Sequence, residues 1–189
     1  TYLMSTLSKH PSGIYVLPSP PGLDGVLTSE IIGKILDQMQ CVFDFVVIDG
    51  GHPLDDISLR ILAMSDIVLM IAILSLPSLT NVRRLLWTFQ QLGYPQEEDI
   101  KIIITRHHKK SVIPLKEAEQ SIKKEIFWLV PNDFFTTMSA INQGKTLSSV
   151  AHEAEITKNL KELASSLLGN GVKQKDQNGF FHWNFSLKS

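Results

Sequence analysis

The sequence contains a single cysteine, Cys41, among its 189 residues. One thiol excludes an internal disulfide framework and any zinc site built on several cysteines, and it is compatible with a reducing cytoplasm. A free cysteine is most often a small buried hydrophobe, so we expect Cys41 to lie in the core. Long apolar runs are also lacking: the longest, Ile67–Leu74, is far shorter than the ~20 residues of a membrane-spanning helix.

Neither sign of charge is in excess. The chain carries 18 Lys and Arg against 19 Asp and Glu, a formal net charge of -1. Without an overall basic field, we expect no direct nucleic-acid partner. A chain of this length can bury a core without disulfides or metals, which predicts one main domain at residues 1–168. The helical period is lost over 169–189, so this segment is interpreted as an irregular tail that contains aromatic residues.

What the sequence does contain is an alternation of short apolar runs with longer segments of helical spacing. Five runs are typical of strands: Ile14–Leu17, Phe43–Asp49, Asp66–Leu74, Ile100–Thr105 and Ile126–Val130. Helices are expected near residues 28–39, 55–64, 77–93, 114–123, 134–143 and 153–168. The alternation predicts βαβ units and therefore an α/β fold, a mostly parallel, doubly wound sheet flanked by helices. The unbroken apolar residues of the second and third runs predict strands covered on both faces.

Ligands of such sheets bind beyond the carboxyl ends of the strands. Asp49 ends one run and is followed by Gly50 and Gly51. In nucleotide triphosphatases a carboxylate in this position holds Mg²⁺ through water, and glycines let the backbone approach a phosphate. The alternative is an aspartate that only caps the next turn. Asp49 is therefore our candidate metal ligand.

Polar residues also follow two later strands. Thr105 and Arg106 can contact a base or a sugar, or they can belong to a solvated loop. Pro131, Asn132 and Asp133 can frame a base with backbone groups, and Asp133 can at the same time cap the next helix. These five residues are our candidates for contact with a nucleotide.

Other features of the sequence are weaker evidence of function. The basic run Arg106–Lys110 can touch phosphate or a partner, but its adjacent histidines lack the i, i+4 spacing of a helical metal pair. His52 has no serine or cysteine nucleophile to pair with, and no catalytic residue is assigned. No G-x-x-x-x-G-K-[ST] motif occurs, and Gly144–Lys145 lacks an upstream strand and glycine loop. We therefore expect the chain to bind ATP weakly or not at all.

The ordered motifs resemble the ATPase domain of the CpaE/TadZ proteins, members of the MinD/ParA family of deviant-Walker ATPases, from about Leu7 to Leu168. The matching segments, in order, are His10–Pro20, Phe43–Asp49, Leu54–Asp56, Ala63–Asp66, Leu76–Leu86, Leu92–Tyr94, Thr105–Arg106, Val130–Phe134 and Ala140–Lys145. The segment Leu76–Leu86 is the most recognisable piece. The family's P-loop unit and its signature lysine have no counterpart here, and Gly50–Pro53 departs from its usual switch loop.

The resemblance implies that residues 1–168 are the C-terminal part of a P-loop NTPase domain. It implies a parent that binds ATP and Mg²⁺, with Asp49 as the magnesium-linked acid and Val130–Phe134 on the base side. The parent would form a homodimer and localise or assemble a Flp/type IV pilus machine with pilus secretion and assembly proteins. It would be cytoplasmic, at the inner-membrane face or cell pole, with peripheral membrane association. The alternatives are a ParA-like partitioning ATPase and a non-catalytic scaffold that retains the fold.

Overall fold

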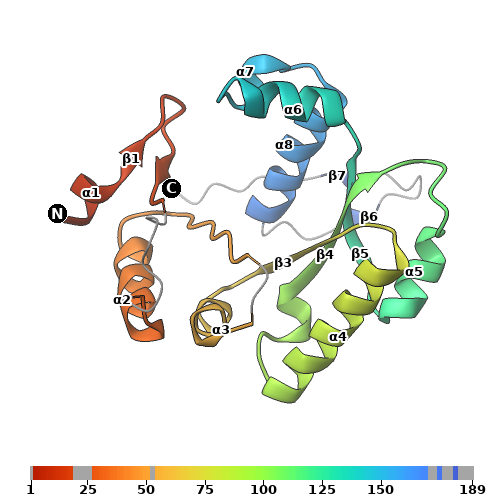
Figure 1. Cartoon of the computed structure of the whole chain (residues 1–189), viewed down its shortest axis with the longest axis horizontal. Helices are drawn as coiled ribbons and strands as arrows, with labels where there is room; N and C mark the ends of the chain where they lie inside the picture. Colours follow the sequence, from red (N-terminus) through yellow and green to blue (C-terminus); the bar gives the residue numbers. More distant parts are fainter. Residues whose placement is uncertain (1, 19–26, 52–53, 170–173, 176–180, 183–189) are drawn as a thin grey trace. The chain divides into compact units, whose positions relative to one another are not determined.

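The computed structural model describes all residues except 1, 19–26, 52–53, 170–173, 176–180 and 183–189 (Figure 1). The chain divides into two compact units, Thr1–Val68 and Leu69–Ser189. Within the described residues, no helix is both long and apolar enough to cross a bilayer.

The first unit contains a short hairpin and two packed helices. Helix α1 (Tyr2–Thr6) precedes β1 (Ser8–Lys9), which pairs antiparallel with β2 (Tyr15–Val16). Helix α2 (Ser29–Gln40) begins after Thr28, whose side chain accepts a hydrogen bond from the backbone N–H of Ile31 at 3.3 Å. Helix α3 (Asp56–Ala63) begins with a capping box between Asp55 and Ser58. The predicted starts of both helices are confirmed, because the capping side chains are visible in the sequence.

Two predictions for this unit are wrong. The segment Phe43–Asp49 is not a strand, and Phe45 and Val47 are 68% and 94% exposed. A strand exists only when a neighbour pairs with its backbone, and no described strand pairs with this segment. Cys41 is exposed rather than buried, because it lies at the C-terminal cap of α2. The run at Ile14–Leu17 forms only the two residues of β2.

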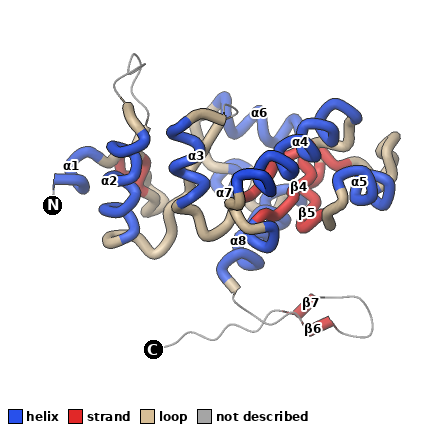
Figure 2. The backbone as a smooth tube through the Cα atoms, turned by 90° about the horizontal axis from the view of Figure 1, so that it is seen from below, coloured by secondary structure: helices blue, strands red, loops and turns tan. Residues whose placement is uncertain are grey.

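The second unit is a three-stranded sheet in the order β3-β4-β5, between layers of helices (Figure 2). Its elements are β3 (Val68–Ala72), α4 (Leu76–Leu92), η1 (Glu97–Asp99), β4 (Ile100–His107), α5 (Leu115–Ile122), β5 (Ile126–Pro131), α6 (Phe134–Asn142), α7 (Leu147–Val150) and α8 (Glu155–Leu168). The first residue of β3 lies at the boundary of the units. Two short strands, β6 (Gln174–Lys175) and β7 (Phe181–His182), pair antiparallel in the predicted tail. The alternating pattern of this unit confirms the predicted α/β class.

The core of the second unit is centred on β4. Ile102, Ile103 and Ile104 are at most 1% exposed. Ile103 packs with Val130 of β5 and with Ile156 and Leu163 of α8. Figure 2 shows α4 on one side of the strands and α8 on the other, so β4 is covered on both faces.

Strand β3 is covered on one face only. Met70 and Ala72 are buried, whereas Leu69, Ile71 and Ile73 are 37%, 58% and 37% exposed. Successive residues of a strand point to opposite faces, so the three exposed residues share one face. Helix α8 packs against β5 at the far edge of the sheet, which leaves this face of β3 uncovered within the described part of the second unit. The prediction that β3 is covered on both faces is wrong for this reason.

Candidate functional site

The carboxyl ends of β4 and β5 lie side by side. The two strands are parallel, and His107 pairs with Pro131 in their register. The backbone N–H of Asn132 donates a hydrogen bond to the carbonyl oxygen of His107 at 3.1 Å. This bond joins the first residue after β5 to the last residue of β4. The structure therefore places the ends of β4 and β5 next to each other, and these ends carry the predicted residues Thr105, Arg106, Pro131, Asn132 and Asp133.

Thr105 and Arg106 are held differently. The half-buried hydroxyl of Thr105 donates a hydrogen bond to the carbonyl oxygen of Ala72 at 3.3 Å, which ties the end of β3 to β4. Arg106 has φ 53°, in the left-handed region that non-glycine residues seldom adopt. Its side chain is exposed. Thr105 is thus engaged within the sheet, while Arg106 has an exposed side chain, and its contact with a base or sugar stays a prediction.

Asp133 caps α6. Its carboxylate accepts a hydrogen bond from the backbone N–H of Thr136 at 3.0 Å, and its carbonyl oxygen accepts one from the hydroxyl of Thr137 at 2.7 Å. The predicted capping role is confirmed. The cap fixes the direction in which the chain leaves β5, and so it fixes the backbone of Asn132. Contact of Asp133 with a base stays a prediction.

Asp49 lies in the first unit, in an exposed extended segment. Its Oδ1 accepts a hydrogen bond from the backbone N–H of Gly51 at 3.3 Å, and Gly51 has φ 63°. This is the turn-capping role that the sequence left as an alternative. His52 and Pro53 lie outside the described residues.

The chemistry of Asp49 fits Mg²⁺ as far as one carboxylate can. Magnesium is commonly held by one or two carboxylates together with waters and substrate phosphates. Across the described ranges, no three or more His, Cys, Asp or Glu side chains form a group that could hold a metal. A magnesium ion at Asp49 would therefore depend on waters and phosphates for its remaining ligands.

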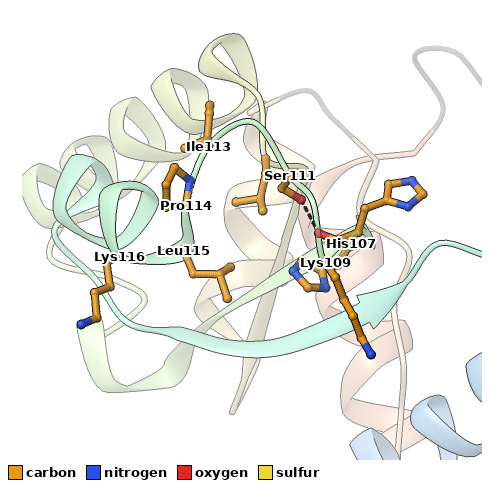
Figure 3. A pocket seen from close by; sticks show the side chains of 9 residues that line it. His107, Lys109, Ser111, Ile113, Pro114, Leu115 and Lys116 are labelled. Atoms are coloured by element: carbon orange, nitrogen blue, oxygen red, sulfur yellow. Dashed lines mark hydrogen bonds between the residues drawn. The ribbon is translucent and has the colours of Figure 1, made fainter.

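A cavity that the sequence did not predict lies beside the basic run (Figure 3). Its volume is about 450 Å³, and it opens between the end of β3 and the loop from β4 to α5. The lining residues are Leu74, His107, His108, Lys109, Ser111, Ile113, Pro114, Leu115 and Lys116. The loop is tightened by Ser111, whose backbone N–H and hydroxyl both donate to the carbonyl oxygen of His108. The basic run was visible in the sequence, but the cavity was not, because it lies where the β4–α5 loop meets Leu74, a residue remote in the chain.

No protein-family model matches the sequence. The septum site-determining protein MinD of Thermotoga maritima is 24% identical over 178 residues, which cover 88% of this chain and 63% of the relative. A ParA family ATPase from Chlorobium tepidum superimposes with a TM-score of 0.81 at 21% identity, over 86% of this chain and 68% of that structure. MinD from Pyrococcus horikoshii, solved with Mg-ADP, superimposes with a TM-score of 0.72 at 15% identity, over 87% and 68%.

These similarities confirm the predicted fold, an α/β fold with a parallel sheet flanked by helices, as in MinD and ParA P-loop NTPases. They support a relationship to MinD/ParA ATPases. The chain spans less than two thirds of the length of the MinD relative. The narrower resemblance to CpaE/TadZ proteins stays a prediction.

Proposed function

We propose that this chain supplies the base-side part of a MinD/ParA-like ATPase. The observation that carries the proposal is the hydrogen bond from Asn132 to His107, which makes one surface of the loops after β4 and β5. The carboxyl ends of neighbouring parallel strands are where α/β proteins bind nucleotides. The Mg-ADP bound by the similar Pyrococcus horikoshii protein supports the choice of nucleotide.

Each residue of the loops after β4 and β5 is assigned a role from the groups that it still has available for a ligand. The N–H of Asn132 is engaged with His107, so its exposed side-chain amide is the group that can pair with the edge of a base. Arg106 can stack its planar guanidinium on the base or contact a ribose oxygen. Pro131 and Asp133 hold the loop in place, and Thr105 fixes the end of β4. These assignments make Asn132 and Arg106 the ligand-contacting pair.

Asp49 is proposed as the magnesium-linked carboxylate. Bound magnesium would offset the negative charge of the β- and γ-phosphates. The chain has no P-loop, whose backbone N–H groups and lysine would cradle those phosphates. We therefore propose that residues 1–168 are the C-terminal part of the ATPase domain, and that ATP hydrolysis needs a P-loop unit in addition to this chain.

The resemblance of Leu76–Leu86 to CpaE/TadZ proteins supports a more specific proposal. In that proposal the whole protein is a homodimeric ATPase that localises or assembles a pilus machine at the cytoplasmic face of the inner membrane. A ParA-like partitioning ATPase is the alternative within the family. A non-catalytic scaffold is the alternative outside enzymes, and it predicts no ATP turnover even with a P-loop unit.

The test uses a protein in which a P-loop unit precedes this chain. Replacing Asp49 with Ala is expected to lower ATP turnover by about 10²-fold or more, because the charge that places magnesium is lost. The matched control is Asp37→Ala, another exposed aspartate of the first unit, which should leave turnover unchanged. Circular dichroism should show that both variants are folded. Unchanged turnover in folded Asp49→Ala would remove the magnesium assignment, and a wild type without turnover would favour the scaffold.

A further inference from the structure

The cavity beside the β4–α5 loop combines an apolar lining with a cationic rim. Leu74, Ile113, Pro114 and Leu115 supply the apolar lining, and His107, His108, Lys109 and Lys116 supply nitrogen-bearing side chains. At about 450 Å³ the cavity is within the range of small ligand pockets. It can take one large apolar side chain or two small ones.

The loop around the cavity is positively charged along its length. Between Arg106 and Lys116 the sequence contains Arg106, Lys109, Lys110 and Lys116 and no Asp or Glu. All four of these cationic residues are exposed. Glu117 on α5 is the first acidic residue that follows. The loop therefore attracts anionic groups over several residues and not at one point.

The direction of the side chains separates the possible ligands. Figure 3 shows Lys109 and Lys116 extending away from each other on different sides of the loop. A single phosphate would be held by cations that converge on it, and these do not converge. An extended ligand with several negative charges and an apolar anchor fits both the spread of charge and the lining of the cavity. The lining contains no Phe, Tyr or Trp on which the bases of a nucleic acid could stack.

We propose that this surface, defined by residues 107–110 and the cavity lining, docks an acidic protein segment. One apolar side chain of the segment enters the cavity, and its carboxylates lie along the basic loop. Val112 lies between the lining residues Ser111 and Ile113 in the sequence and is 97% exposed, so the same loop presents a further apolar side chain. Charge complementarity of this kind sets partner choice and speeds association. The proposal does not depend on nucleotide binding.

The experiment measures fluorescence anisotropy with the intact chain and a labelled peptide, Glu-Glu-Leu-Glu-Glu-Phe-Glu-Glu. Saturable binding is expected, and it should weaken as salt is added, because the charges are exposed. The double variant Lys109→Glu/Lys110→Glu should bind about tenfold or more weakly. The matched control Arg83→Glu/Lys161→Glu reverses two exposed cations outside the cavity lining and should bind like the wild type.

Two further ligands test the proposal without changing the protein, one the apolar anchor and the other the class of partner. A peptide with Ser in place of Leu and Phe should bind about tenfold or more weakly, because the apolar anchor is gone. Equal binding of that peptide would overturn the anchoring role of the cavity. Unchanged binding by the Lys109/Lys110 variant would overturn the basic surface. Tighter binding of a labelled oligothymidylate than of the acidic peptide would replace the protein partner with a nucleic acid.

Discussion

The backbone N–H of Asn132 donates a hydrogen bond to the carbonyl oxygen of His107 across the ends of two parallel strands. The bond extends the β4–β5 ladder beyond its last residue pair, His107 and Pro131. It engages the backbone N–H of Asn132, while the side chains of Asn132 and Arg106 are exposed and are the groups that we propose to contact a nucleotide. The ends of β4 and β5 are therefore joined by sheet pairing, and the helix cap at Asp133 is a second support of the same loop.

The cap at Asp133 is the first support to test. Asp133→Ala removes the acceptor for the N–H of Thr136 and should lower the free energy of unfolding by about 1 kcal/mol. Asp133→Asn should recover most of the loss, because asparagine caps helices about as well as aspartate. Urea unfolding followed by circular dichroism measures both variants. Equal stability of Asp133→Ala and the wild type would show that the cap does not hold this loop.

Asn159 joins α8 to β5 through two hydrogen bonds. Its side-chain Nδ2 donates a hydrogen bond to the backbone carbonyl oxygen of Leu129 at 3.0 Å, and its side-chain Oδ1 accepts one from the indole N–H of Trp128 at 3.1 Å. Asn159→Leu leaves two half-buried polar groups without these partners and should cost about 2 kcal/mol of unfolding free energy. Gln120→Leu, a similar change at an exposed helix position, should cost little. If both variants lose the same amount in urea unfolding, the bridge is not a stabilising contact.

Glu153 should titrate well below an ordinary glutamate. The hydrogen bond from Lys158 is the largest cause, and that from His152 follows; together they lower the pKa of Glu153 from 4.5 to about 2. A lowered pKa means that the contribution to stability is present above about pH 4.5 and is lost as the pH falls toward about 2. The carboxylate is exposed, so the effect on stability should be small and should shrink in salt.

The measurement for Glu153 is an NMR titration of its side-chain carboxyl carbon. Lys158→Met should raise the pKa of Glu153 toward its ordinary value, because the main partner is removed. Lys161→Met, an exposed lysine on the same helix, is the control and should leave it unchanged. A pKa near 4.5 in the wild type would contradict the geometry of this ion pair.

Much of the second unit could be predicted from local chemistry. Ser75 and Gly93 delimit α4, and Gly93 adopts φ 74°, a conformation that glycine adopts without strain. The apolar run from Ile100 to Ile104 became the buried strand β4. The parallel pairing of β4 and β5 then placed His107, the residue after Arg106, beside Pro131 and Asn132 at the carboxyl ends of the strands. These features depend on contacts close in the chain or on the commonest topology.

What could not be predicted depends on remote partners. The run Phe45–Ile48 is as apolar as a core strand, yet a strand needs a neighbour, and none of the described strands pairs with it. Cys41 is apolar enough for the core but follows the last turn of α2 and is exposed. The cavity at Leu74 and Ile113 joins two loops that are 39 positions apart in the sequence numbering. A local sequence pattern does not predict a contact between segments that are distant in the chain.

We propose that the loops after β4 and β5 form the base side of a nucleotide site. Photolabelling the chain with 8-azidoadenosine tests this directly, because this nucleoside presents a base without needing a phosphate cradle. The account predicts label within residues 105–108 and 131–134, protection by excess adenosine, and weaker label in Arg106→Ala. Label spread over the chain and unaffected by adenosine would contradict it.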